Sequence, residues 1–236
     1  MILIHENMSR GRSRKGWADA FHSFSFGSFN DPTRMGFARL RVLNEDRIVP
    51  GAGFAPHDHA DMDILTVVLS GRVRHEDSLG NRAEIAPGEM QLMRAGSGVT
   101  HSEVNASQDE PVHLLQIWLI PDQRGGTPGY QSAPFTEGLL ASRNGPLKLG
   151  SDTRVTLLRR RDGETTPISV APGRAVFVQI LDGFALIDGE RVTAGDGVQL
   201  TETPPDLNWH TDGAILIFDM PMGFGPDPQQ QAAAGP

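Results

Sequence analysis

The chain has 236 residues, with a formal net charge of −8 at pH 7, no cysteine, 27 glycines and 17 prolines. The length allows one large domain or two of ordinary size, and the composition fits a turn-rich β protein better than a helical bundle or a disordered chain. The acidic charge argues against nucleic acid as a partner, and the lack of cysteine excludes disulfides and thiolate metal ligands.

We expect the N-terminal region to carry neither a secretory signal nor a membrane span. The start MILIHENMSR lacks a long apolar segment, and no stretch of the chain approaches the ~20 apolar residues that a spanning helix needs. We therefore expect a soluble, cytoplasmic protein with no membrane partner. A small basic cluster is interpreted as a solvated loop and consists of Arg10, Arg12, Arg14 and Lys15.

Strand signals dominate the rest of the chain. Apolar, β-rich runs that end at glycine or proline lie at residues 64–69, 114–120, 174–181 and 214–220. Short runs of this kind, separated by turn residues, predict an antiparallel sandwich or barrel. Because no long helical period is present, helices are expected to be few and short, within residues 135–142 or near the N-terminus.

An internal repeat divides the chain. The pair Gly71 and Gly88 is echoed by Gly183 and Gly195, and an apolar strand ending at a proline follows each pair. The repeat predicts an all-β fold of two jelly-roll-like barrels in tandem. The expected parts are an N-terminal barrel over residues 1–130, a linker over 131–150, a C-terminal barrel over 151–223 and a flexible tail over 224–236.

Two short motifs in the first barrel carry potential metal ligands. His57 and His59 are two residues apart, and so are His101 and Glu103. In a β-strand, residues at this spacing point to the same face of the sheet. Three imidazoles and one carboxylate converging inside a barrel would make a mixed nitrogen and oxygen site, suited to iron, manganese, nickel, copper or cobalt.

The second barrel is expected to hold no metal. Counting back from Gly183 places Ser169 and Ala171 where the first barrel has its two-histidine motif. Counting forward from the repeat glycine places Asn208, with His210 nearby, where the first barrel has His101. A single histidine does not hold a transition metal.

Other candidate residues are expected to have supporting roles. Asp63 offers a further carboxylate, but it is one methylene shorter than Glu103, so we favour Glu103 as the ligand and expect Asp63 to orient a histidine through a hydrogen bond. His75 lies in a charged hairpin and is expected at the surface. His113 is expected to be a hydrogen-bonded residue at a sheet edge.

These motifs resemble the two conserved motifs of the cupin superfamily and, in more detail, the pirin family. The resemblance covers residues 20 to 130 tightly and the rest of the chain by architecture. It rests on the two metal-ligand motifs and on blocks at Phe21–Phe26, Leu40–Asp46, Pro50–Phe54, His75–Asn81, Pro87–Glu89 and Gln116–Pro121.

The resemblance implies a fold, a metal site and an activity. Pirins are bicupins, two cupin barrels in tandem, whose N-terminal barrel holds one metal through three histidines and a glutamate. Carried over by position, the ligands are His57, His59, His101 and Glu103. Iron(II) is the first expectation for the metal, with manganese, nickel, cobalt, copper and zinc as alternatives.

The implied activity is that of a dioxygenase that cleaves a flavonol such as quercetin with O₂. In this reaction Glu103 is the expected catalytic base, taking the proton of the substrate's 3-hydroxyl group. Two other functions remain open: a metal-containing regulatory protein that binds a protein partner, and a cupin enzyme with a different substrate. The chain is expected to be a monomer.

Overall fold

The computed structural model describes residues 1–204 and 206–223. Within them the one helix is η1 (Asn7–Ser9), a single 3₁₀ turn, which confirms the expected short helix near the N-terminus. The expected helix within residues 135–142 is wrong. There β13 (Gly138–Ser142) forms instead, with Leu140 and Ala141 turned into the core. No helix in the described residues is long and apolar enough to cross a membrane.

The chain folds into two compact units. The N-terminal unit consists of Gly11–Phe135 with Leu149–Ser151; the C-terminal unit consists of Thr136–Lys148 and Asp152–Gly223 with Met1–Arg10. The first ten residues join the C-terminal unit because β1 (Ile2–His5) pairs with β20 (Gly197–Leu200). Residues 131–150, predicted as a linker, contribute strands to both units, and residues 224–236 lie outside the described part of the chain.

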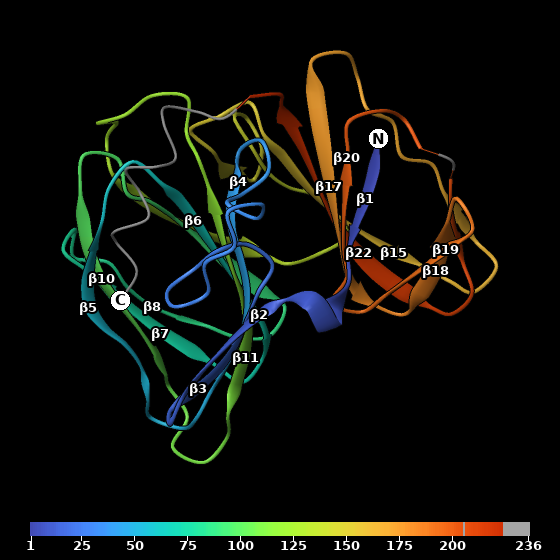
Figure 1. Ribbon diagram of the computed structural model, residues 1–236. Helices are drawn as coiled ribbons and strands as arrows, with labels where there is room; N and C mark the ends of the chain where they lie inside the picture. The colour runs from blue at the N-terminus through green and yellow to red at the C-terminus, as the bar shows by residue number, and fades with distance from the viewer. Residues whose placement is uncertain (205, 224–236) are drawn as a thin grey trace. The chain divides into compact units, whose positions relative to one another are not determined.

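The N-terminal unit is a sandwich of two antiparallel sheets (Figure 1). Its large sheet has the order β12-β9-β6-β11-β4-β3-β2, made of β2 (Gly11–Lys15), β3 (Ala18–His22), β4 (Leu40–Ile48), β6 (Asp63–Ser70), β9 (Glu89–Arg94), β11 (Val112–Leu119) and β12 (Gly129–Pro134). Its small sheet has the order β5-β10-β7-β8, made of β5 (Gly53–His59), β7 (Val73–Asp77), β8 (Arg82–Ile85) and β10 (Val99–Asn105).

The C-terminal unit repeats this topology. Its large sheet has the order β1-β20-β17-β22-β15-β13-β14, adding β14 (Leu147–Lys148), β15 (Arg154–Arg160), β17 (Arg174–Asp182) and β22 (Gly213–Pro221). Its small sheet has the order β16-β21-β18-β19, made of β16 (Thr165–Thr166), β18 (Phe184–Ile187), β19 (Glu190–Thr193) and β21 (Leu207–Trp209). Strands β15 to β22 thus match β4 to β11 one for one. This confirms the tandem cupin fold, although each unit is a sandwich of sheets and not a closed barrel.

Apolar side chains fill the interior of the C-terminal unit. Trp209 is 2% exposed and packs in a core cluster with residues of β17, β18, β20 and β22. Its indole Nε1 donates a hydrogen bond of 3.0 Å to Thr166 Oγ1 on β16, the strand that matches β5. Ser169 and Ala171, predicted at the matching positions, lie beyond β16 because the connection to β17 is longer than the repeat spacing indicates. Trp209 pairs with Ala185 as Asn105 pairs with Val73 in the other unit, so the indole fills the interior beside, and not at, the positions that match the histidines.

Replacing Trp209 tests how much this core depends on one side chain. Trp209→Ala leaves a large cavity and an unpaired Thr166 hydroxyl, so we expect the free energy of unfolding to fall by about 3–5 kcal/mol in urea denaturation. The exposed neighbour in Asn208→Ala is the control, with a change within about 0.5 kcal/mol. Equal unfolding midpoints for Trp209→Ala and wild type would show that the indole does not hold this core.

Candidate metal centre

Strand β10 turns both residues of the second motif into the N-terminal unit. Its burial alternates with a period of two, so that Val99, His101, Glu103 and Asn105 are buried while the residues between them face outward. His101 is 2% exposed and Glu103 is 1% exposed. The prediction that these two side chains share the inner face is confirmed.

Strand β5 places the first motif against β10. His57 lies opposite His101 in the antiparallel register, and the register shifts just beyond this pair, where Glu103 lies opposite Phe54. The extra residue falls at Ala55 and Pro56. Pro56 cannot donate a ladder hydrogen bond, so a β-bulge accommodates it. In the bulge His57 Nδ1 donates to Ala55 O at 2.7 Å, which leaves Nε2 as its ligand atom.

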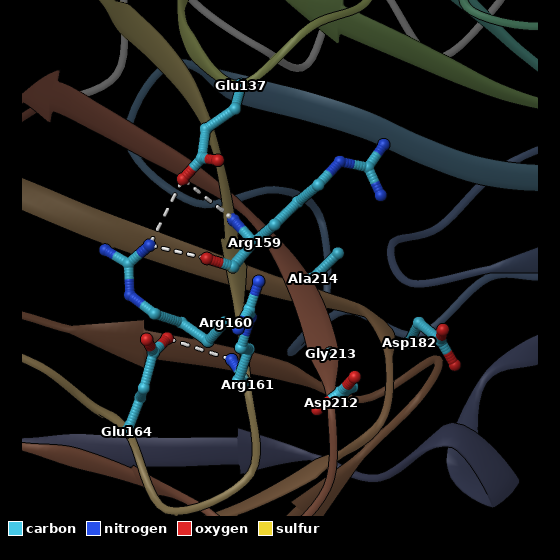
Figure 2. Close-up of a pocket in the computed structure, with 9 residues that line it drawn as sticks. All are labelled: Glu137, Arg159, Arg160, Arg161, Glu164, Asp182, Asp212, Gly213 and Ala214. Carbon is cyan, nitrogen blue, oxygen red and sulfur yellow. Dashed lines mark hydrogen bonds and ion pairs between the residues drawn. The ribbon is translucent and has the colours of Figure 1, made fainter.

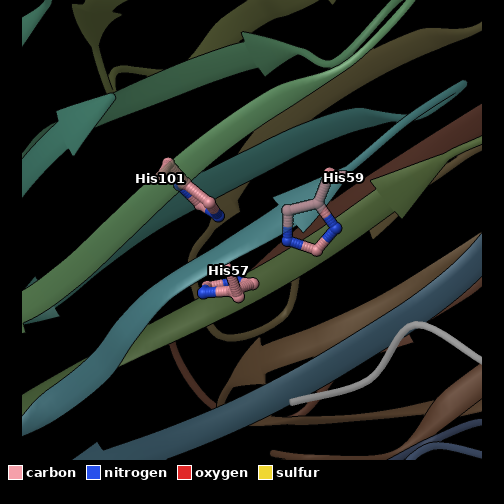
Figure 3. A group of neighbouring side chains, drawn as sticks. All are labelled: His57, His59 and His101. Atoms are coloured by element: carbon pink, nitrogen blue, oxygen red, sulfur yellow. The ribbon is translucent and has the colours of Figure 1, made fainter. Parts of the chain in front are cut away.

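The three histidines form one compact group (Figure 3). One nitrogen from each of His57, His59 and His101 lies within 4.8 Å of the other two. The ring centroids are 4.7 Å apart for His57 and His59, 4.6 Å for His57 and His101, and 5.0 Å for His59 and His101. Nitrogens that each bind one ion at ~2.0–2.1 Å lie at most about 4.2 Å apart, so these rings need at most small rotations to bind one ion together.

The protonation state of the group also suits a metal ion. His59 Nε2 and both nitrogens of His101 are buried and find no hydrogen-bond partner in the part of the chain that the structure describes. Burial, followed by the neighbouring His57, lowers the pKa of His59 to about 4 and that of His101 to about 2. Neutral imidazoles with unsatisfied lone pairs are the form that binds transition metals, so the donor set fits a divalent ion.

Three hydrogen-bond donors hold the buried carboxylate of Glu103. Oε1 accepts from Thr66 Oγ1 at 2.7 Å and from Gln91 Nε2 at 2.6 Å, and Oε2 accepts from Gln116 Nε2 at 2.6 Å. An ionised carboxylate only accepts hydrogen bonds, so three donors match it. These donors are register neighbours on β9, β6 and β11, and they face β10 across the sandwich.

Glu103 belongs to a second ligand group that also contains His101. The third member is His75, and the expectation that it lies at the surface is wrong, because it is completely buried. His75 Nε2 lies 3.1 Å from Asp77 Oδ2, and its ring stacks on Tyr130 at 4.7 Å. The alternation of Val73, His75 and Asp77 along β7 was the signal in the sequence that places His75 on the inner face.

Asp63 has a different role from the one expected. A turn with Asp61 at φ 55° separates β5 from β6. The alternation of side chains along β5, which turns His59 inward, therefore does not extend to Asp63. Its Oδ2 accepts a hydrogen bond from the Gly150 N–H, and Arg94 Nε lies 3.5 Å from Oδ1. The carboxylate therefore anchors residues 149–151 to the unit and orients no histidine. His113 bonds to Glu45 Oε1 at 2.9 Å, but on β11, between β6 and β4, and not at a sheet edge.

The row of polar side chains around Glu103 continues across the large sheet. Asn44 is the register partner of Gln116, and His22 is the partner of Asn44. His22 Nδ1 lies 2.8 Å from Asn44 Oδ1, and its Nε2 lies 2.8 Å from Ser13 Oγ on β2. None of these residues formed part of the predicted site, because none of them belongs to a pair of metal-ligand residues at strand spacing.

Asp46 lies two residues beyond Asn44 on the inner face of β4. It is 2% exposed, and its Oδ1 has no hydrogen-bond partner among the described residues. Burial, followed by the negative charges of Glu103 and Glu45, raises the pKa of Asp46 to about 7. The Oδ1 atom of Asp46 is therefore a buried acceptor without a donor among the described residues.

A cavity of about 390 Å³ opens in the N-terminal unit, and its lining residues do not include the three histidines or Glu103. Its aromatic lining is Trp17, Phe26 and Phe54, and its polar lining includes His22, Asn44 and Asp46. The ring of Phe54 lies 6.1 Å from that of His57. On the other side, Phe26 lies 5.5 Å from Trp118, and Trp118 lies 4.9 Å from His59. Aromatic rings thus connect the cavity wall to two of the three histidines.

The C-terminal unit has a hollow of a different kind, of about 380 Å³ (Figure 2). Its lining is charged, and its carboxylates already accept hydrogen bonds. Glu137 Oε1 accepts from the Arg159 N–H and from Arg160, both at 3.2 Å, and Glu164 Oε2 accepts from the Arg161 N–H at 2.9 Å. None of the nine described residues that line it is a histidine, so it is no counterpart of the metal centre.

The topology and the histidine group together define a bicupin whose N-terminal unit contains a candidate transition-metal centre. The family profile "Pirin" matches residues 5–119, and the profile "Quercetinase C-terminal cupin domain" matches residues 139–220. The chain is 38% identical to "Quercetin 2,3-dioxygenase" of Escherichia coli (strain K12) over 229 residues, covering 94% of this chain and 99% of the relative. The chain belongs to the pirin family.

Solved structures agree with this assignment. The bacterial pirin YhhW of Escherichia coli, solved in complex with nickel(II), has a TM-score of 0.91 at 38% identity, covering 94% of this chain and all of that chain. The protein YhaK of Escherichia coli has a TM-score of 0.70 at 31% identity, covering 90% of this chain and 94% of the other.

The close pairing of β5 with β10 can be tested at Gly53. A Cβ at this position would lie 2.2 Å from Glu103 O and 2.5 Å from Val104 Cα, so Gly53→Ala must push the two strands apart. We expect at least about tenfold weaker binding of manganese(II) by calorimetric titration, because ligand geometry tolerates little displacement. Gly16→Ala, where a Cβ meets no described atom within 4 Å, is the control. Wild-type affinity in folded Gly53→Ala would contradict this account of the site.

The buried carboxyl of Asp46 predicts a pH-dependent stability difference. A raised pKa in the folded state stabilises at low pH, and this contribution is lost as pH rises through about 7. Asp46→Asn removes that loss, so the stability of the metal-free variant relative to wild type should rise between pH 4 and 7. Measured by urea denaturation, the difference in the free energy of unfolding between variant and wild type should increase by up to about 1.4 kcal/mol per pH unit. A difference that does not change with pH would contradict the assigned ionisation.

Proposed function

We propose that this pirin is a metal-dependent dioxygenase that cleaves a flavonol such as quercetin with O₂. The observation that carries the proposal is the group of three imidazoles, of which His59 and His101 are buried with unsatisfied nitrogens, together with a nearby buried carboxylate that three donors orient. Relatives named quercetin 2,3-dioxygenase support the reaction, and the nickel(II) complex of YhhW supports a divalent metal. Iron(II) is the metal we propose. The cytoplasmic location and the monomeric state stay predictions.

His57, His59, His101 and Glu103 are the proposed ligands. Glu103 follows His101 on the inner face of β10 and shares a ligand group with it, which supports Glu103 as the fourth ligand. When bound, the metal would supply Lewis acidity toward an enolate oxygen and a redox-active centre for O₂. The protein's own contribution is to hold the ligands in place and to accept one proton from the substrate.

Glu103 is the proposed base for the 3-hydroxyl proton of the substrate. On protonation it becomes a donor and needs an acceptor beside it. Thr66 can meet this need, because its hydroxyl rotates from donating to Oε1 to accepting from it. The amides of Gln91 and Gln116 keep donating and so fix the carboxyl in both states.

The cavity beside the histidines suits a flat, ring-containing substrate. Its volume of about 390 Å³ falls within the range of small-molecule sites. Phe54 and Phe26 provide aromatic faces near the metal centre, on which a flavonol ring system can stack.

Variants of two site residues and one control residue test the proposal. Iron(II)-loaded wild type should consume O₂ and quercetin in equal amounts and release carbon monoxide. His57→Ala should lose metal, because one of three imidazoles is gone. Glu103→Gln should keep its fold and lose about 10²–10⁴-fold in turnover, as expected for the loss of a general base.

His113→Ala is the matched histidine control, since His113 bonds to Glu45 outside the ligand group. It should keep wild-type metal content and turnover. Equal slow consumption of quercetin by wild type and His57→Ala, at measured metal contents, would contradict the proposed function. So would full turnover in Glu103→Gln, which would assign the proton to another group.

A further inference from the structure

The amide of Gln91 links the buried carboxylate of Glu103 to the edge of the large sheet. Gln91 is 1% exposed, and its Nε2 donates to Glu103 Oε1 at 2.6 Å. At the other end of the same amide, Oε1 accepts a hydrogen bond of 2.9 Å from the hydroxyl group of Tyr130. Tyr130 lies on the edge strand β12, which pairs with β9, and it is the one tyrosine of the chain. It is thus connected to the proposed ligand carboxylate through a single amide.

The amide of Gln91 holds a carboxylate in only one of its two orientations. In the orientation described, Nε2 faces the carboxylate and Oε1 faces the phenol. Turning the amide by 180° would put an oxygen where Nε2 lies, 2.6 Å from Glu103 Oε1, so that two acceptors would repel each other and one of three donors would be lost. Contacts that favour the first orientation therefore also stabilise the position of Glu103.

The atoms near Nε2 favour this orientation. Besides Glu103, Nε2 lies 3.3 Å from Thr66 Oγ1 and 3.5 Å from His75 Nδ1. His75 Nε2 lies 3.1 Å from the carboxylate of Asp77, which only accepts hydrogen bonds. In the neutral ring the proton is therefore on Nε2, and Nδ1 is an acceptor. Each of the three atoms around the amide nitrogen can accept one of its hydrogens.

Tyr130 is the donor at the opposite end of the amide. Its ring stacks on the completely buried ring of His75, with centroids 4.7 Å apart and an interplanar angle of 27°. This contact directs the hydroxyl group toward Gln91. Burial, followed by the negative charge of Glu103, raises the pKa of Tyr130 to about 12, so the hydroxyl group keeps the proton that it donates.

We propose that Tyr130 is a positioning residue of the metal centre, which acts through the amide of Gln91 to hold the carboxylate of Glu103 where it binds the ion. This inference rests on the proposed ligand set, in which Glu103 is the fourth ligand. It also gives His75 a role other than metal binding, since both of its ring nitrogens face hydrogen-bond partners.

Removal of one hydroxyl group tests the proposal. Tyr130→Phe keeps the aromatic ring on His75 and takes away the donor to Gln91 Oε1. Calorimetric titration of the metal-free protein with manganese(II) measures affinity without turnover. We expect Tyr130→Phe to bind manganese(II) about three- to tenfold more weakly than wild type. Gln91→Met removes the direct donor to the ligand and should bind it about 10–100-fold more weakly.

A matched control and a spectrum separate positioning from a general effect on the fold. Ser25→Ala removes a hydroxyl group that donates to Asp31 O at 2.8 Å in the same unit. It should keep wild-type affinity for manganese(II). The visible absorption spectrum of the cobalt(II) protein reports the geometry of the ligands, so it should change in Tyr130→Phe and not in Ser25→Ala.

The double variant shows whether Tyr130 acts through the amide. In the Gln91→Met background, Tyr130→Phe should change the affinity by less than about twofold, because residues that act through one another have non-additive effects. Wild-type affinity or an unchanged cobalt(II) spectrum in Tyr130→Phe would overturn the inference. So would a loss of affinity of equal size in both backgrounds.

The outcome is separable from that of the proposed function. Wild-type affinity in Glu103→Gln would remove Glu103 from the ligand set, and the inference with it. If Glu103→Gln binds manganese(II) weakly and Tyr130→Phe binds it as wild type does, the ligand set holds and the inference is wrong. If Tyr130→Phe behaves as expected but the iron(II) protein does not turn over quercetin, the proposed reaction fails and the role of Tyr130 holds.

Discussion

The structure of the N-terminal unit depends on the satisfaction of one buried negative charge. An ionised carboxylate in the interior of a β-sandwich is costly unless hydrogen bonds or counter-charges surround it. Thr66, Gln91 and Gln116 supply three donors to Glu103 from three adjacent strands. This arrangement requires that β9, β6 and β11 keep their register and that β10 faces them. The same constraint keeps His101 at a fixed position beside the carboxylate.

The two units show how one topology accommodates opposite interiors. Strands β5 and β10 pair through His57 and His101, whereas Thr166 on β16 and Trp209 on β21 meet inside the C-terminal unit. The indole fills space, and its N–H is satisfied by the threonine hydroxyl. An apolar interior gains stability from burial. A polar interior needs a network of hydrogen-bond partners, and its side chains provide atoms that can bind a metal ion.

Much of this organisation could be predicted from the sequence. The spacing of His57 with His59 and of His101 with Glu103 identified residues on two paired strands. This was possible because side chains alternate every two residues within a strand, whatever the rest of the fold. The interpretation of Asp63 failed since a turn at Asp61 resets the phase between strands. His75 was missed because the charges beside it face outward and conceal the alternation of β7. Thr66, Gln91 and Gln116 become neighbours only through sheet register, which no single segment of sequence encodes.

The most direct test of the account is the position of the bound metal in a crystal, located by anomalous scattering at its absorption edge. The account predicts one ion within ~2.0–2.2 Å of a nitrogen of each of His57, His59 and His101 and of a Glu103 oxygen. The structure also contains a competing group, His75 with His101 and Glu103. An ion bound by that group, or an ion on the three histidines with Glu103 out of reach, would contradict the account.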